Sequence, residues 1–179
     1  MFPSHDILDL KLKYNFETGI KYAITIGGIT DYSDNEIESD IYYSGIPEDA
    51  EAKDLVWNEI MFNAPDNSSA YVEIFNLSNK VIELTEMYIS TRKNDGSLNT
   101  GNKITDYLLI YPKEYAAFTT SADSVRKYHN CPQDANIYKL NLNSLNNTSA
   151  SIVLTNNTKE MIYDEFRYDE KLISVIFKF

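Results

Sequence analysis

The sequence predicts an all-β protein: a β-sandwich with one short crossover helix at about residues 121–129 and an N-terminal β-hairpin remnant. The chain is rich in aromatic residues, with fourteen Tyr and eight Phe against six Gly, and aromatic side chains pack well across strands. Apolar and polar residues alternate with period two along many short segments, as they do in half-buried strands. Turn residues separate these segments at the regular spacing that is typical of a sandwich.

Length and charge limit the classes of function. The 179 residues suffice for one domain with its own core and a fragment of a second. The net charge of -11 disfavours binding to nucleic acid and leaves cations, basic proteins and neutral glycans as partners. No apolar run approaches the roughly 20 residues of a transmembrane helix, so we expect no membrane insertion. The lone Cys131 cannot form an internal disulfide.

Residues 1–45 carry too few strands to close a sandwich of their own. We expect them to be the C-terminal strands of a preceding domain or a β-extension of the main domain. The strands are expected at 7–13, 20–26 and 41–43. Residues 46–53 follow Gly45 and contain Pro47 and several charges, which predicts a linker, and residues 54–179 then form the main domain. The first six residues lack the basic and apolar regions of a secretory signal.

Nine alternating segments follow in the main domain, with turn residues between them. They lie at 55–62, 71–75, 81–84, 87–91, 107–110, 115–120, 137–140, 151–155 and 161–168. In 115–120 the alternation predicts burial on one side only. The helical exception is 121–129, where Ser121 or Thr120 can cap the free N–H groups and Val125 and Tyr128 share a face. The long polar loop 92–106 is expected to contact a partner.

Several motifs resemble, in order and spacing, those of the lamin tail domain. A strand with Asn58-Glu59-Ile60 precedes the strand Tyr71-Val72-Glu73-Ile74-Phe75-Asn76, and the similarity covers about residues 54–168. Further matching segments are Lys80–Leu84, Leu109–Tyr115 and Ala150–Leu154. Residues 22–35 resemble the last hairpin of a bacterial immunoglobulin-like repeat.

This resemblance implies an immunoglobulin-like sandwich without catalytic residues or cofactors. In bacteria such modules accompany other domains of secreted or surface proteins, so it implies an extracellular, periplasmic or cell-surface location beside neighbouring domains of a longer polypeptide. The residues that carry the motif are given a structural role first; they are Asn58, Glu59, Glu73, Asn76, Pro112 and Tyr115. Asn76 ends a strand, where its side chain can hydrogen-bond the backbone of the following turn.

The chain departs from the family pattern at two turns. Glu86-Met87 stands where the family often has Gly-Trp, and Lys113 stands where it often has the Gly of Pro-Gly-Glu. Glycine is favoured wherever the backbone must be left-handed. We therefore expect both turns to be rebuilt without glycine.

The sequence gives little support for a catalytic site. Only His5 and His129 could act as a histidine base, and no Gly-x-Ser-x-Gly elbow is present. His129, Cys131 and Asp134 could form a soft metal site or a Cys-His pair, but we interpret them as a helix end and a turn with a half-buried thiol. The carboxylate pairs Asp164-Glu165 and Asp169-Glu170 point to opposite faces of a strand, so we interpret them as solvated acids on an edge strand.

The sequence also contains a candidate calcium site. The acidic stretch 31–40 offers hard oxygen ligands, and the candidate ligands are Asp31, Asp34, Asn35 and Glu36. Calcium prefers such ligands, but the stretch lacks the glycine of an EF-hand loop.

Three functional hypotheses follow. The first is a non-catalytic interaction or adhesion module that contacts a protein or glycan at a cell surface. The alternative is a carbohydrate-binding accessory domain of a glycan-degrading enzyme, in which Tyr88, Tyr107 or Tyr111 stacks on sugar rings. The third, an independent hydrolase, requires converging acids in a concave site. The sequence favours the first and predicts no enzymatic activity.

Overall fold

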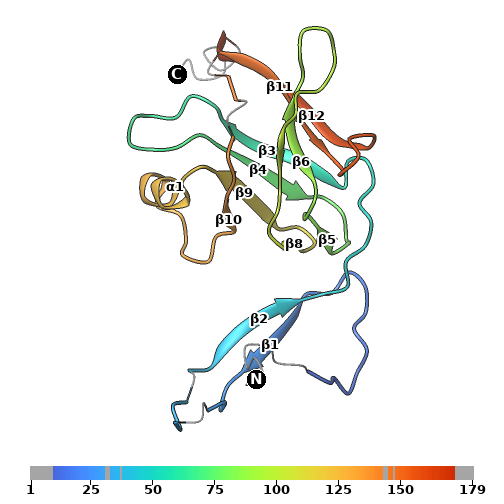
Figure 1. Cartoon of the computed structure of the whole chain (residues 1–179), viewed down its shortest axis with the longest axis vertical. Coiled ribbons are helices and arrows are strands. Elements are labelled where there is room, and N and C mark those ends of the chain that lie inside the picture. Colours follow the sequence, from blue (N-terminus) through green and yellow to red (C-terminus); the bar gives the residue numbers. More distant parts are fainter. Residues whose placement is uncertain (1–9, 31–32, 37, 143–144, 147, 172–179) are drawn as a thin grey trace, which may run out of the picture.

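The computed structural model describes residues 10–30, 33–36, 38–142, 145–146 and 148–171. Within them the chain forms twelve strands and one helix, drawn in Figure 1. The elements are β1 (Tyr22–Ile26), β2 (Asp40–Ser44), β3 (Leu55–Met61), β4 (Tyr71–Asn76), β5 (Ile82–Glu83), β6 (Tyr88–Thr91), β7 (Asn102–Lys103), β8 (Leu109–Ile110), β9 (Tyr115–Thr119), α1 (Ala122–His129), β10 (Ile137–Lys139), β11 (Ser149–Thr155) and β12 (Ile162–Asp169).

Two four-stranded sheets form the sandwich. Sheet A has the order β10-β9-β4-β3 and sheet B the order β12-β11-β6-β7. All neighbours in these sheets are antiparallel except β9 and β10, which are parallel. A parallel pair requires a crossover connection, and α1 provides it. The predicted all-β sandwich of immunoglobulin-like type, with one short crossover helix, is confirmed.

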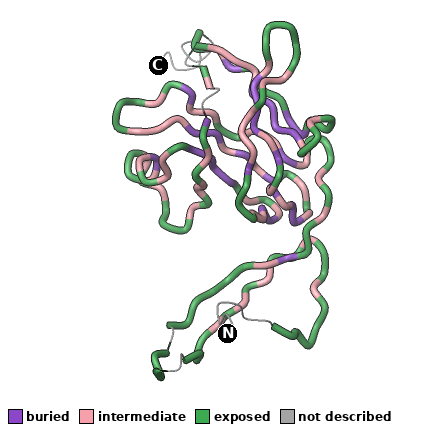
Figure 2. The backbone as a smooth tube through the Cα atoms, viewed as in Figure 1, coloured by how far each residue is buried: buried purple, intermediate pink, exposed green. Residues whose placement is uncertain are grey.

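The core lies between the inner faces of the two sheets, where Figure 2 shows the buried residues. On β4, Val72 and Ile74 point inward and are fully buried. Sheet B contributes Ile152 and Leu154, which are also fully buried. The short pair β5-β8 closes one end with Ile82 and other apolar side chains. Strand alternation thus produces one continuous apolar layer.

The helix begins and ends as its sequence predicts. Ser121 is the N-cap and its side chain accepts a hydrogen bond from the Ser124 N–H, which satisfies one free donor of the first turn. Asn130 ends the helix in a left-handed conformation with φ of 50°, a role that Asn tolerates. Val125 is the buried residue of the helix and fixes it against sheet A.

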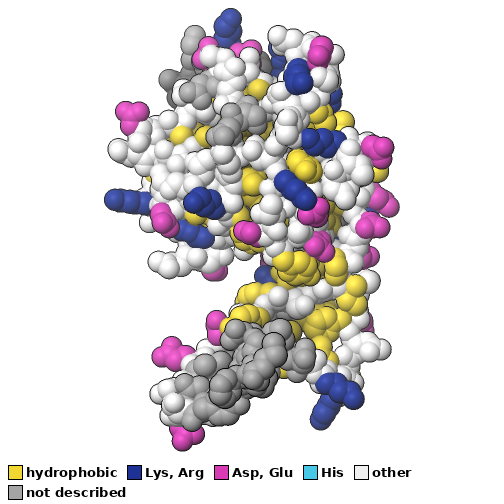
Figure 3. All heavy atoms as spheres, in the orientation of Figure 1, with side chains coloured by type: hydrophobic (Ala, Val, Ile, Leu, Met, Phe, Trp, Pro, Cys, Tyr) yellow, Lys and Arg dark blue, Asp and Glu magenta, His cyan; other side chains and the backbone are white. Residues whose placement is uncertain are grey.

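The β1-β2 hairpin projects from the sandwich (Figure 1). Its strands leave Ile41, Tyr42 and Tyr43 about half exposed, and Figure 3 shows hydrophobic side chains gathered where the hairpin meets the sandwich. The segment 46–53 is hydrogen-bonded to the sandwich: the Glu48 N–H donates to the Val81 carbonyl at 2.8 Å.

Three details differ from the expectations. In β9, the outward-facing Ala117 and Thr119 are buried as well as the inward-facing residues. The prediction that this strand is buried on one side only is therefore wrong, because the crossover through α1 covers part of the outer face. The loop 92–106 contains β7, which pairs with β6. Of the strand expected at 7–13, residues 7–9 lie outside the described residues, and residues 10–13 form no strand.

Candidate functional site

A groove of about 1030 Å³ runs across the outer face of sheet A. Its floor is a row of directly paired residues on four strands, Glu59 on β3, Glu73 on β4, Ala117 on β9 and Ile137 on β10. Directly paired residues project from the same side of a sheet. The floor therefore changes from acidic at the β3 end to apolar at the β10 end.

A shift of register in β3 places Glu59 in this row. Trp57 pairs with Ile74 and Glu59 with Glu73, so Asn58 has no partner on β4. If β3 were regular and had no bulge, strict alternation would put Glu59 on the same side as Trp57, facing the core. A bulge of one residue reverses the faces that follow it. The carboxylate consequently reaches the groove, and Ile60 replaces it against the core.

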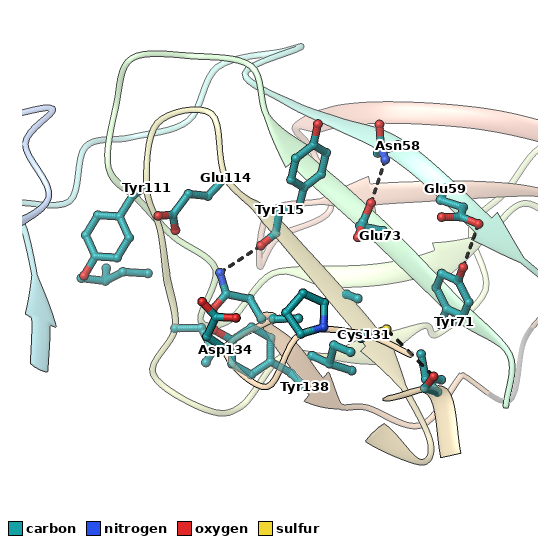
Figure 4. Close-up of a pocket in the computed structure, with 18 of the residues that line it drawn as sticks. Asn58, Glu59, Tyr71, Glu73, Tyr111, Glu114, Tyr115, Cys131, Asp134 and Tyr138 are labelled. Atoms are coloured by element: carbon teal, nitrogen blue, oxygen red, sulfur yellow. Dashed lines mark hydrogen bonds between the residues drawn. The ribbon is translucent and has the colours of Figure 1, made fainter. Parts of the chain in front are cut away.

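Neutral donors hold the two carboxylates, as Figure 4 shows. The Tyr71 hydroxyl donates to Glu59 Oε1 at 2.7 Å, and Asn58 Nδ2 donates to Glu73 Oε1 at 2.7 Å. Burial raises the pKa of Glu73; the hydrogen bond from Asn58 opposes this shift, and the negative charge of Glu59 adds to it. Burial and the bond to Glu59 likewise raise the pKa of Tyr71. The two carboxylates are therefore fixed by hydrogen bonds, but the donors of these bonds carry no positive charge.

Aromatic and apolar side chains form the walls. Tyr115 packs against Phe75 with ring centroids 4.7 Å apart and is 47% exposed, so one side of the ring is open to solvent. Val125 of α1 and residues of the segment after the helix also line the groove. Tyr71 contacts the His129 ring edge-on at 5.3 Å, which anchors the helix end to the groove wall.

The hairpin reaches the other end of the groove, where Tyr111 and Glu114 lie (Figure 4). Lys21 Nζ is 2.6 Å from Glu114 Oε1 and lies over two aromatic rings, 4.1 Å from the Tyr43 centroid and 4.8 Å from the Tyr111 centroid. Burial, with smaller contributions from Glu114 and from the phenols of Tyr107 and Tyr138, raises the pKa of Tyr111 to about 12. A basic side chain therefore already sits between aromatic rings and a carboxylate here.

The six motif residues separate into two groups. Asn58, Glu59, Glu73 and Tyr115 line the groove. Asn76 lies on the inner face and is fully buried. The last of the six, Pro112, precedes Lys113 in the turn before β9.

Asn76 has a structural role. Its Nδ2 donates to the carbonyls of Lys80 at 2.8 Å and Ile110 at 3.2 Å. Its Oδ1 accepts from the backbone N–H of Ser78 at 3.0 Å. One side chain thereby satisfies three groups of the β4-β5 turn and of β8, as a buried amide must.

The turns at Glu86 and Lys113, where the sequence predicts a turn without glycine, both adopt left-handed backbone. Glu86 has φ of 73° and Lys113 has φ of 63°. Each is the third residue of a turn closed by a backbone hydrogen bond, from Met87 to Leu84 and from Glu114 to Tyr111. That position requires positive φ in type II turns, which is why glycine is preferred there.

The three tyrosines proposed for sugar stacking do not share one surface. Tyr107 is 67% exposed and Tyr111 is 6% exposed, although both line the groove. Tyr88 is on β6 of sheet B, where Lys159 Nζ lies 4.4 Å from its ring centroid. A planar platform of all three is therefore not formed.

The residues that the sequence offers as metal ligands are His129 and Cys131 for a soft metal, and the acidic stretch for calcium. His129 and Cys131 both line the groove, and Cys131 Sγ is 4.0 Å from the Val125 carbonyl oxygen. Among the described residues, no three His, Cys, Asp or Glu side chains are grouped to hold a metal. For calcium, Asp34, Asn35 and Glu36 are exposed in the β1-β2 connection, and Asp31 lies outside the described residues. Calcium binding stays a prediction.

Asp164 and Glu165 are neighbours in β12 and point to opposite sides, as expected in a strand. Asp169 is the last residue of β12, and Glu170 lies beyond it. Glu165 is exposed and pairs with Arg92. Asp164 is 8% exposed, so its interpretation as a solvated acid is wrong. It accepts from the Trp57 N–H at 2.9 Å and from Lys53 Nζ, and these donors stabilise the carboxylate between the edges of the two sheets.

Comparisons with family models and with curated proteins found no match for this chain. In the part of the chain that the structure describes, no helix is long and apolar enough to cross a membrane. The groove is therefore the feature on which a functional conclusion must rest.

Proposed function

We propose that this chain is a non-catalytic binding module that holds a segment of a partner protein in the groove across sheet A. The single observation that carries the proposal is the groove itself, about 1030 Å³ in volume, with an acidic end, an apolar end and an aromatic wall. Binding sites combine apolar lining with a few placed polar groups in this way. A rigid sheet presents these groups with little entropy to lose on binding.

The arrangement of the acids supports a non-catalytic role. Glu59 and Glu73 project side by side from one row of one sheet face. Glycoside hydrolysis needs two carboxyl groups that flank the scissile bond. Acids that stand next to each other on the same floor do not enclose a substrate in that manner.

The motif resemblance supports the same proposal from the sequence. The left-handed residues Glu86 and Lys113 lie at the positions where lamin tail domains often carry Gly. We propose that the chain is such a module in a secreted or surface protein, adjacent to further domains.

A paired screen tests the proposal. The purified chain is applied to peptide, protein and glycan arrays beside Tyr115→Ala, which removes the open groove wall, and Tyr14→Ala, which removes an exposed tyrosine (84% exposed) outside the groove. We expect a peptide or protein ligand that the wild type and Tyr14→Ala bind equally and Tyr115→Ala binds more weakly. Ligands that all three bind equally, or binding of glycans alone, would overturn the proposal.

A further inference from the structure

Among the described residues, no basic side chain pairs with the two carboxylates at the acidic end of the groove. Lys21 pairs with Glu114, and Lys113 Nζ donates to the Leu77 carbonyl. Within the described residues, neither Glu59 nor Glu73 forms an ion pair; their hydrogen bonds come from a phenol and an amide. Two carboxylates directly opposite each other repel, so a bound cation would relieve a cost that the free protein bears.

The floor next to these acids suits an aliphatic chain. Ala117 is opposite Glu73 and lines the groove with a small apolar side chain. Ile137 continues the row, and Val125 lines the same region. An apolar strip that leads to two carboxylates matches a side chain with a methylene stem and a cationic head, as in Lys and Arg.

The chain itself provides an example of this chemistry. At the hairpin end of the groove, Lys21 contacts Glu114 and two aromatic rings. Cations are stabilised over aromatic faces and beside carboxylates. Next to it, Glu73 and Tyr115 present the same two kinds of group (Figure 4), and among the described residues no Lys or Arg forms an ion pair with Glu73.

We infer that the groove binds a Lys or Arg side chain from a basic segment of the partner, with its stem over Ala117 and Ile137 and its cationic head at Glu59 and Glu73. This inference rests on the proposed function and names the class of ligand. The net charge of -11 favours the approach of a basic partner, since complementary charge speeds association.

The test uses the whole chain and three fluorescent peptides, (Gly-Arg)5, (Gly-Lys)5 and the neutral (Gly-Gln)5, in anisotropy titrations. The groove variant is E59Q/E73Q. The matched control is E38Q/D66N, which removes two exposed acids elsewhere on the surface and changes the net charge equally. Glutamine keeps the shape and one acceptor oxygen of each glutamate, and thermal melts verify that all variants are folded.

We expect the wild type and E38Q/D66N to bind a basic peptide with affinities within about twofold of each other. The groove variant should bind at least about tenfold more weakly, as loss of a close charge contact requires. Equal losses in both variants would reveal general attraction to the acidic surface and overturn the inference, as would binding of (Gly-Gln)5 as tightly as the basic peptides.

The outcomes also separate this inference from the proposed function. If the wild type binds no basic peptide while an array ligand still depends on Tyr115, the groove is a binding site for another class of ligand. In that case the inference fails and the proposed function stands. If neither basic peptides nor array ligands depend on groove residues, both fail.

Discussion

Replacement of Glu73 by Gln should stabilise the folded protein at pH 7. Glu73 stands directly opposite Glu59 and is half-buried, and a like-charged cross-strand pair costs up to about 1 kcal/mol. Gln retains an oxygen that can accept the 2.7 Å hydrogen bond from Asn58. We expect the free energy of unfolding to rise by about 0.5–1 kcal/mol, and the Tm by about 1–4 °C.

The gain should depend on pH in a defined direction. Because the folded-state pKa of Glu73 is raised above 4.5, the folded protein binds more protons than the unfolded chain between these two pKa values. Wild-type stability attributable to this group therefore falls as the pH rises through that window. Gln does not titrate, so the advantage of Glu73→Gln should be absent below the unfolded pKa and complete above the folded one.

Urea unfolding at pH 3 and pH 7, followed by the fluorescence of the single tryptophan, Trp57, measures this effect. Glu38→Gln is the control, because Glu38 is exposed and its neutralisation should change stability by less than about 0.5 kcal/mol. A variant that is destabilised at pH 7, or one stabilised equally at both pH values, would refute the electrostatic explanation.

Three further predictions concern the framework, and urea unfolding at pH 7 checks each. Asn76→Ala should lower the free energy of unfolding by about 3 kcal/mol, because two carbonyls lose their donor; a loss below about 1 kcal/mol would contradict this role. Asp164→Ala should cost about 2 kcal/mol by removing the acceptor of the Trp57 N–H, and an unchanged midpoint would contradict it. Glu86→Gly and Lys113→Gly should each stabilise by about 0.5 kcal/mol, because glycine relieves left-handed strain; destabilisation of both would contradict this.

The strands could be predicted because period-two alternation directly reports which side chains are buried. The expected segment 71–75, for example, corresponds to β4. The helix could be predicted because Ser121 caps its first turn and Val125 supplies its buried contact. β7 was missed, since two residues paired within a polar loop leave no apolar pattern.

The groove could be predicted only in part. The motif resemblance singled out Glu59 and Glu73, but their pairing depends on the bulge at Asn58 and on the register of β3 with β4, which apolar alternation does not specify. The sequence also does not predict that Ala117 lies in the groove, because this depends on the pairing of β9 with β4 that puts Ala117 beside Glu73. A hint was available in the alternation of Tyr71 and Glu73, which places both on one side of a strand.

The most direct test of the central claim is a ¹H-¹⁵N NMR titration of the labelled chain with (Gly-Arg)5. The account predicts that the largest shifts fall on β3, β4 and β9 around Glu59, Glu73 and Ala117, and that E59Q/E73Q abolishes them. Shifts confined to the β1-β2 connection or to sheet B, with the groove residues unchanged, would contradict it.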